Sequence, residues 1–104
     1  MAVAYVQEFA IADRSTTNYD WVKDQIGEGP FDGLICHTAG FDDDAGVFRI
    51  LDVWETREQG EKFINERLNP IIEPMAAAAA QDADSDFAPP SRETWYELHD
   101  SMTG

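Results

Sequence analysis

The chain has 104 residues and a mass of 11.7 kDa, so we expect a single domain over residues 1–104. Its 21 acidic residues against 7 Lys and Arg give a net charge of −14 at pH 7, which argues against nucleic acids and anionic membranes as partners. A hydrophobic content of 43%, with 12% aromatic residues, argues against global disorder.

The N-terminal part of the chain predicts a strand followed by a short helix. Residues 3–9 mix β-branched and aromatic side chains, which is typical of a strand. Residues 15–17 offer helix N-caps, and Gly27 is placed to end a helix. Between them, three residues recur at helical spacing: Tyr19, Val22 and Ile26. We therefore expect an amphipathic helix here, followed by a loop over residues 27–33.

Two apolar, β-rich runs follow, over residues 33–41 and 47–55. They are separated by three aspartates, an alanine and a glycine, so we predict a β-hairpin. The aspartates alone do not make a calcium site, because a calcium loop spreads its ligands over about twelve residues. We expect a solvated hairpin tip and no metal.

A second helix should begin directly after the hairpin. Thr56 and Gln59 have the spacing of a capping box, and apolar residues continue at helical spacing beyond them. Pro70 interrupts this helix, and either Pro70 or Pro74 opens a second segment that runs into residues 76–80, which are all alanine.

The C-terminal part predicts a connection and a last strand. Residues 81–93 are rich in aspartate and proline, so we expect a surface connection with Phe87 as its apolar anchor, and residues 94–99 form the final strand. The order βαββαβ predicts an α+β, ferredoxin-like fold: an antiparallel four-stranded sheet with the helices on one face.

The third strand is apolar on both faces. Val47, Leu51 and Val53 lie on one face, and Phe48, Ile50 and Trp54 lie on the other. Helices cover only one face, and burying the other contributes about 25 cal/mol per Å² of apolar area. We therefore expect a sheet-to-sheet homodimer, the alternative being a long loop of the same chain that covers this face.

The cysteine content and the apolar segments indicate the compartment. Cys36 is the only cysteine, so no intramolecular disulfide forms and a reducing cytoplasm is the expected location. Residues 1–9 lack the basic segment of a signal peptide, and the alanine run at 76–80 is too short to cross a bilayer. We expect a cytoplasmic protein without a membrane span.

Three segments carry a resemblance to a known group: residues 32–37 (DGLICH), residues 46–56, which end in V-W-E-T, and Phe63 with residues 68–70 (LNP). Because of these segments, the chain resembles the dimeric α/β-barrel superfamily, and within it the antibiotic-biosynthesis-monooxygenase-like proteins. The resemblance covers residues 3–99. The resemblance implies a ferredoxin-like fold, a homodimer with facing sheets, and a small-molecule cavity between sheet and helices. It leaves the reaction open, because the superfamily includes monooxygenases, haem-degrading enzymes, isomerases and members with no assigned reaction.

The resemblance does not extend to a cofactor. Haem-degrading relatives pair a first-strand asparagine with a tryptophan and a helical histidine. Here the first strand offers Gln7, Trp54 can match the tryptophan, and the second helix has no histidine. Glycine-rich phosphate loops and paired-cysteine zinc motifs are also missing from the sequence, so we expect neither a cofactor nor a metal.

His37 and Asp52 are polar residues within the predicted hairpin, and the strand register decides whether they meet. Pairing of Phe41 with Val47 separates them, whereas pairing of Gly40 with Val47 places them diagonally on one face. In the second register the carboxylate orients the imidazole, which then serves as a proton acceptor for an enolisable substrate. The alternative is a half-buried histidine satisfied by its neighbour, with no substrate.

Several aromatic residues supply flat apolar walls for a small-molecule ligand: Trp54, Tyr96, Tyr5 and Phe63, together with Trp95. The same residues could simply form the core. The sequence therefore predicts a cofactor-independent monooxygenase, or a proton-transfer isomerase, acting on an aromatic or polyketide-like molecule, with His37 as base and Asp52 as its orienter. The alternative is a non-catalytic dimeric binding or stress-associated protein.

Overall fold

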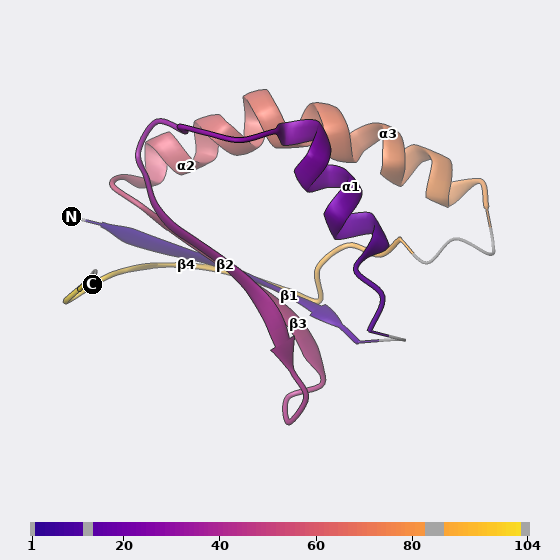
Figure 1. Cartoon of the computed structure of the whole chain (residues 1–104), viewed down its shortest axis with the longest axis horizontal. Coiled ribbons are helices and arrows are strands. Elements are labelled where there is room, and N and C mark those ends of the chain that lie inside the picture. Colours follow the sequence, from indigo (N-terminus) through magenta and orange to yellow (C-terminus); the bar gives the residue numbers. More distant parts are fainter. Residues whose placement is uncertain (1, 12–13, 83–86, 103–104) are drawn as a thin grey trace.

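The computed structural model describes residues 2–11, 14–82 and 87–102. The elements are, in order, β1 (Val3–Ala10), α1 (Thr17–Ile26), β2 (Leu34–Asp42), β3 (Val47–Trp54), α2 (Arg57–Phe63), the π-helical turn η1 (Ile64–Leu68), α3 (Asn69–Ala80) and β4 (Arg92–Glu97). The strands form an antiparallel sheet in the order β2-β3-β1-β4, and the helices lie over one of its faces (Figure 1). This confirms the ferredoxin-like α+β fold, and the segment predicted after the interruption is present as α3, which makes the order βαββααβ.

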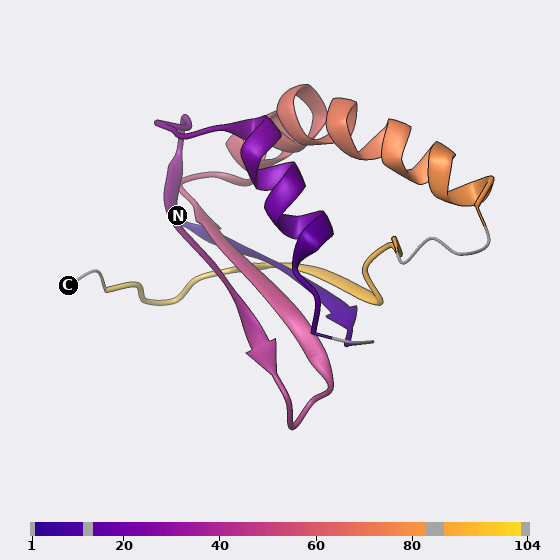
Figure 2. The same ribbon diagram turned by 45° about the vertical axis from the view of Figure 1, so that its right-hand side comes forward.

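Helix α1 begins and ends where its sequence predicts. The Thr16 hydroxyl donates a hydrogen bond of 2.8 Å to the Asp20 carboxylate in the first turn. Gly27 ends the helix with a φ of 79°, a conformation that glycine adopts at little cost, and its N–H donates to the Lys23 carbonyl at 3.0 Å. The helix lies across the sheet, beside the long α2–α3 segment (Figure 2).

The second helical segment runs from Arg57 to Ala80, and the interruption expected at Pro70 is a π-helical turn. Thr56 caps α2 by accepting a hydrogen bond from the Gln59 N–H at 3.2 Å, as the capping-box pattern predicts. The wider turn η1 is followed directly by α3, and Pro70 lies in the first turn of α3, where the missing N–H of a proline costs no helical hydrogen bond. Pro74 lies inside α3 and does not start a segment.

The hairpin register differs from both registers considered in the sequence. Asp42 pairs with Val47, so β2 ends one residue later than expected and His37 lies directly opposite Asp52. The turn explains the shift, because the Asp42 carboxylate accepts a hydrogen bond from the Ala45 N–H at 3.1 Å and Gly46 has a φ of 71°. An irregularity between Leu34 and Cys36 then absorbs one residue on β2.

Among the described residues, the buried apolar side chains gather at one end of the sheet, next to the start of α2. They are Val3, Ala4, Tyr5 and Trp54, with Leu34, Phe63, Ile64 and Trp95 packed against them. Trp54 is only 1% exposed. Gly60 of α2 lies directly over it, and a Cβ there would be 2.9 Å from the Trp54 ring and 2.8 Å from the Trp95 ring.

The last strand begins two residues earlier than predicted. The Ser91 N–H donates to the Glu8 carbonyl at 2.7 Å, which brings the chain alongside β1 before Arg92. Residues 83–86 of the predicted surface connection lie outside the described residues. Within the part of the chain that the structure describes, no helix has the length and apolar character needed to traverse a bilayer.

Candidate functional site

A cavity of about 470 Å³ lies between the sheet and the helices. Apolar side chains from the sheet, both helical segments and the connection before β4 line it, among them Phe9, Phe48, Ile50, Val22, Ile72 and Phe87. The strand residues among them share the helix-facing side of the sheet, since they pair directly across β1 and β3. The cavity is therefore the kind of site that takes a flat apolar molecule.

His37 and Asp52 meet in the wall of this cavity. The His37 Nδ1 contacts the Asp52 Oδ1 directly, and both residues line the cavity. The Asp52 side chain is 14% exposed and the His37 side chain 30%, so the carboxylate lies beneath the imidazole. A carboxylate accepts, so Nδ1 carries the proton in the neutral ring and Nε2 is left with a lone pair.

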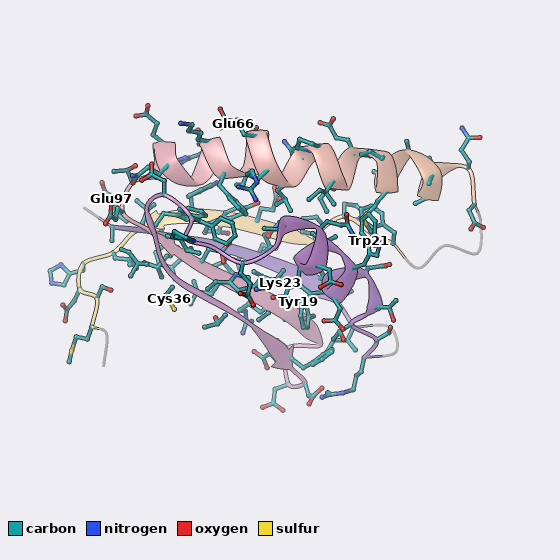
Figure 3. All side chains as sticks on the ribbon, turned by 45° about the horizontal axis from the view of Figure 1, so that its top comes forward. Tyr19, Trp21, Lys23, Cys36, Glu66 and Glu97 are labelled. Atoms are coloured by element: carbon teal, nitrogen blue, oxygen red, sulfur yellow. The ribbon has the colours of Figure 1, made fainter. Side chains whose placement is uncertain are left out.

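Tyr19 completes this constellation from α1 (Figure 3). Its hydroxyl oxygen lies 2.7 Å from the His37 Nε2, which accepts the phenol proton in the tautomer that Asp52 favours. Phe48 packs edge-on against the Tyr19 ring, with centroids 5.4 Å apart. Burial raises the pKa of Tyr19 above its ordinary value, and the charges of Asp52 and Asp20 raise it further.

Tyr19 was not predicted as a functional residue, because its spacing in the sequence marks it only as part of an apolar helix face. A usable signal was present: a tyrosine on the buried face of a helix needs a partner for its hydroxyl. Its partner, His37, could not be identified without the register.

A second polar pair lies beside this constellation. The Tyr5 hydroxyl donates to the Glu93 carboxylate at 2.9 Å, and Tyr5 stands directly opposite Asp52 across β1 and β3. Burial raises the pKa of Tyr5 strongly, and the hydrogen bond to Glu93 and the charges of Glu93 and Asp52 act in the same direction. Tyr5 therefore remains a neutral donor.

Three of the four aromatic residues predicted to bind substrate line the cavity, namely Tyr5, Trp54 and Phe63. Trp54 and Phe63 pack together with ring centroids 5.3 Å apart, and Trp54 is also a core residue. The expected placement of Tyr96 beside them is wrong, because Tyr96 lies on the other face of the sheet and is 48% exposed. Trp95 and Tyr96 are neighbours in one strand, so their side chains point to opposite faces.

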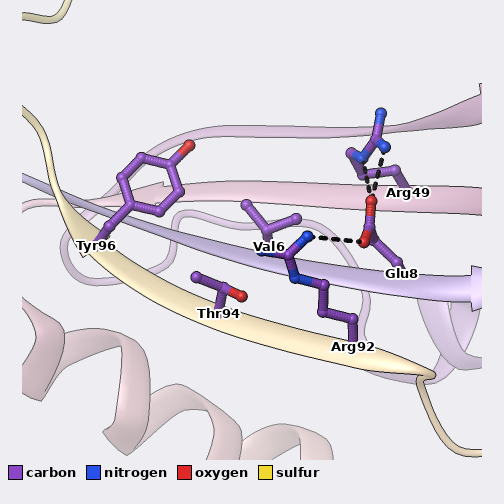
Figure 4. Close-up of a pocket in the computed structure, with 6 residues that line it drawn as sticks. All are labelled: Val6, Glu8, Arg49, Arg92, Thr94 and Tyr96. Atoms are coloured by element: carbon purple, nitrogen blue, oxygen red, sulfur yellow. Dashed lines mark hydrogen bonds and ion pairs between the residues drawn. The ribbon is translucent and has the colours of Figure 1, made fainter.

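A second, separate depression of about 260 Å³ lies on the face of the sheet opposite the helices (Figure 4). Its lining is Val6, Glu8, Arg49, Arg92, Thr94 and Tyr96. Arg49 binds Glu8 at 2.6 Å and Asp42 at 2.8 Å, and Arg92 approaches Glu8 at 3.9 Å. The hydrogen bond from Arg49 lowers the pKa of Asp42.

Comparisons with known proteins bear on the fold. Neither a family model nor a curated protein sequence matches the chain significantly. A candidate antibiotic biosynthesis monooxygenase from Chloroflexus aurantiacus J-10-fl matches with a TM-score of 0.64 and 10% identity, over 99% of this chain and 98% of that one. A single-residue mutant of SnoaB, a cofactor-independent oxygenase from Streptomyces nogalater, matches with a TM-score of 0.60 and 14% identity over the same shares.

These matches span nearly the whole of both chains, so they compare complete folds and not a shared fragment. At 10% and 14% identity they show the fold alone. They confirm, at the level of the fold, the resemblance found in the sequence: this chain has the ferredoxin-like fold of the antibiotic-biosynthesis-monooxygenase-like proteins.

Proposed function

We propose that this protein binds a small aromatic or polyketide-like molecule in the cavity and oxygenates it without a cofactor. The observation that carries the proposal is the contact between His37 and Asp52 in the wall of an otherwise apolar cavity. SnoaB, which has the same fold, is a cofactor-independent oxygenase, and this supports the choice of reaction class.

The constellation is suited to removing a proton. His37 accepts it, and the largely buried Asp52 carboxylate stabilises the imidazolium that forms. Loss of a proton leaves an electron-rich phenolate from a phenol, or an enolate from an activated CH₂, and either can react with O₂ directly. Return of the proton to a different carbon would instead give an isomer, so one base serves both reaction classes.

A non-catalytic binding protein is the second candidate, and one observation favours it. Both ring nitrogens of His37 have hydrogen-bond partners, Asp52 and Tyr19, as in a histidine that serves only the structure. Under this alternative the cavity binds its ligand and releases it unchanged.

Replacement of His37 separates the two candidates. With an anthrone as the probe substrate, we expect the wild-type protein to consume one O₂ per anthrone and to form the quinone and one water, the CH₂ becoming a carbonyl. The variant His37→Ala should be slower by roughly a hundredfold or more, the usual contribution of a general base. Circular dichroism should show an unchanged fold, because the His37 side chain is 30% exposed.

The matched control is His99→Ala, which removes the other histidine of the chain, an exposed residue outside the cavity lining. It should keep wild-type turnover. Equal rates for His37→Ala and the wild type would remove His37 as the base. Tight binding of the anthrone by the wild type without O₂ uptake would identify a binding protein.

We also propose that a second copy of the chain covers the sheet face opposite the helices. This face carries Val6, Leu51 and Val53, and the half-exposed ring of Tyr96. Within the four strands its charges balance, because two acidic residues and two arginines lie there: Glu8, Asp42, Arg49 and Arg92. On a chain with a net charge of −14, a neutral and partly apolar face is where two copies repel each other least.

The variant Leu51→Arg tests this interface. It places a charge at the centre of the face. We expect the dimer dissociation constant to rise roughly a hundredfold, because substitutions at the centre of an interface commonly cost this much binding free energy. Sedimentation velocity at low micromolar concentration should show the wild type at twice the 11.7 kDa chain mass and the variant at the chain mass. The control Trp21→Arg, at an exposed aromatic residue of α1, should remain dimeric. A wild type that sediments at 11.7 kDa would contradict the proposal.

The placement of the cysteine supports a cytoplasmic location. Cys36 is a partly exposed free thiol, and it pairs with Val53 on the sheet face opposite the helices. Such a thiol persists in a reducing compartment, which is where we propose that the protein acts. Because it faces away from the cavity, Cys36 has no part in the proposed chemistry.

A further inference from the structure

Both nitrogens of the proposed base are occupied. Asp52 accepts from Nδ1, and the Tyr19 hydroxyl lies 2.7 Å from Nε2. A ligand in the cavity therefore cannot reach a free lone pair on His37 while Tyr19 keeps this position. The Tyr19 hydroxyl can be reached, because an oxygen that donates one hydrogen bond retains lone pairs that accept another.

We propose that Tyr19, and not His37, is the group that takes the proton from the ligand, and that the ligand is a phenol or an enol. This inference rests on the proposed function of the cavity. The ligand O–H transfers its proton to the Tyr19 oxygen while the proton of Tyr19 passes to the His37 Nε2. The products are a phenolate or enolate, a neutral Tyr19, and an imidazolium paired with the Asp52 carboxylate, so protons and charge balance.

The surroundings of Tyr19 favour a relay over a free tyrosinate. Burial and the negative charges of Asp52 and Asp20 keep the Tyr19 hydroxyl protonated, so an isolated tyrosinate is disfavoured. In a relay Tyr19 gives and receives a proton in one step and carries no net charge afterwards. The positive charge forms on His37, directly beside Asp52.

Among the described residues that line the cavity, Tyr19 is the hydroxyl hydrogen-bonded to the His37 Nε2. The other charged side chains in the lining are Arg14, Lys23 and Glu93. Arg14 binds Asp43, and Glu93 accepts the hydrogen bond of Tyr5. A phenol or an enol suits this relay, because its O–H can donate to the Tyr19 oxygen while its apolar body lies against the apolar lining.

The test uses 4-nitrophenol, whose yellow phenolate reports the position of the proton. At a pH where the free probe is mostly neutral, we expect the probe bound to the wild-type protein to show phenolate absorbance. In Tyr19→Phe the probe should still bind, but the ratio of bound phenolate to phenol should fall roughly tenfold or more, as expected for loss of a hydrogen bond to a charged group. His37→Gln, which cannot take up the relayed proton, should show a similar fall.

The control Tyr96→Phe removes a hydroxyl outside the cavity and should match the wild type. Unchanged phenolate absorbance in Tyr19→Phe would overturn the relay and leave the cavity and His37 in their proposed roles. Phenolate retained in His37→Gln would also overturn it, because Tyr19 would then act alone. If the wild type bound the anthrone but not 4-nitrophenol, the ligand class would be wrong while the proposed function stood. Binding of neither probe would contradict both.

Discussion

Replacing Trp54 by alanine is expected to lower the free energy of unfolding by about 3–5 kcal/mol, the range found when a large buried aromatic side chain is removed. Trp54 is 1% exposed, lies in the small core with Val3 and Tyr5, and packs against Phe63. Few other buried side chains are available in the described chain to close the space that would be left. For a domain of this size such a loss is a large fraction of the total stability.

Urea unfolding followed by circular dichroism would measure the effect. The control Trp54→Phe keeps an aromatic ring in the same place and should cost less than half as much. If Trp54→Ala unfolded at the same urea concentration as the wild type, the core would not depend on this residue, and the assignment of the sheet end as the core would be wrong.

Replacing Gly60 by leucine is expected to destabilise the protein by about 3 kcal/mol or more, through overpacking. A single Cβ at this position would lie 2.8 Å from the Trp95 ring and 2.9 Å from the Trp54 ring. Removing a glycine from a helix interior gains only about 1 kcal/mol in helix propensity, so the steric cost dominates. Gly60→Ala should show the same sign with a smaller effect.

Gly40 provides the matched control, because a Cβ built there has no neighbour within 4 Å. Gly40→Ala should leave the urea midpoint nearly unchanged. A Gly60→Ala variant more stable than the wild type would mean that α2 can move away from the sheet, contrary to the close packing of this helix on the two indole rings.

Most of the fold could be predicted from the sequence because its signals are local. β-Branched and aromatic residues mark β1, the capping box at Thr56 starts α2, and Gly27 ends α1. The π-helical turn was not predictable in this way, since it reflects how one continuous helix accommodates Pro70 while it stays packed on the sheet.

The candidate site was predicted only in part, because its members come from different elements. His37 and Asp52 could be paired only if the register was known, and the register depended on the hydrogen bonds of the hairpin turn. Tyr19 joins them from α1 through a contact that no local pattern encodes. Tyr96 was misplaced because residue type was weighed without the alternation of the strand.

The core lies at one end of the sheet, and much of the cavity lining lies beyond it. Val3, Tyr5 and Trp54 hold the fold together, and Tyr5 and Trp54 also line the near part of the cavity, whereas side chains such as Phe9 and Phe48 line it farther along the same strands. Substitutions at the second set can therefore reshape what the protein accepts without unfolding it. A scaffold divided in this way can acquire new chemical specificities while its architecture persists, even when the sequences have drifted almost completely apart.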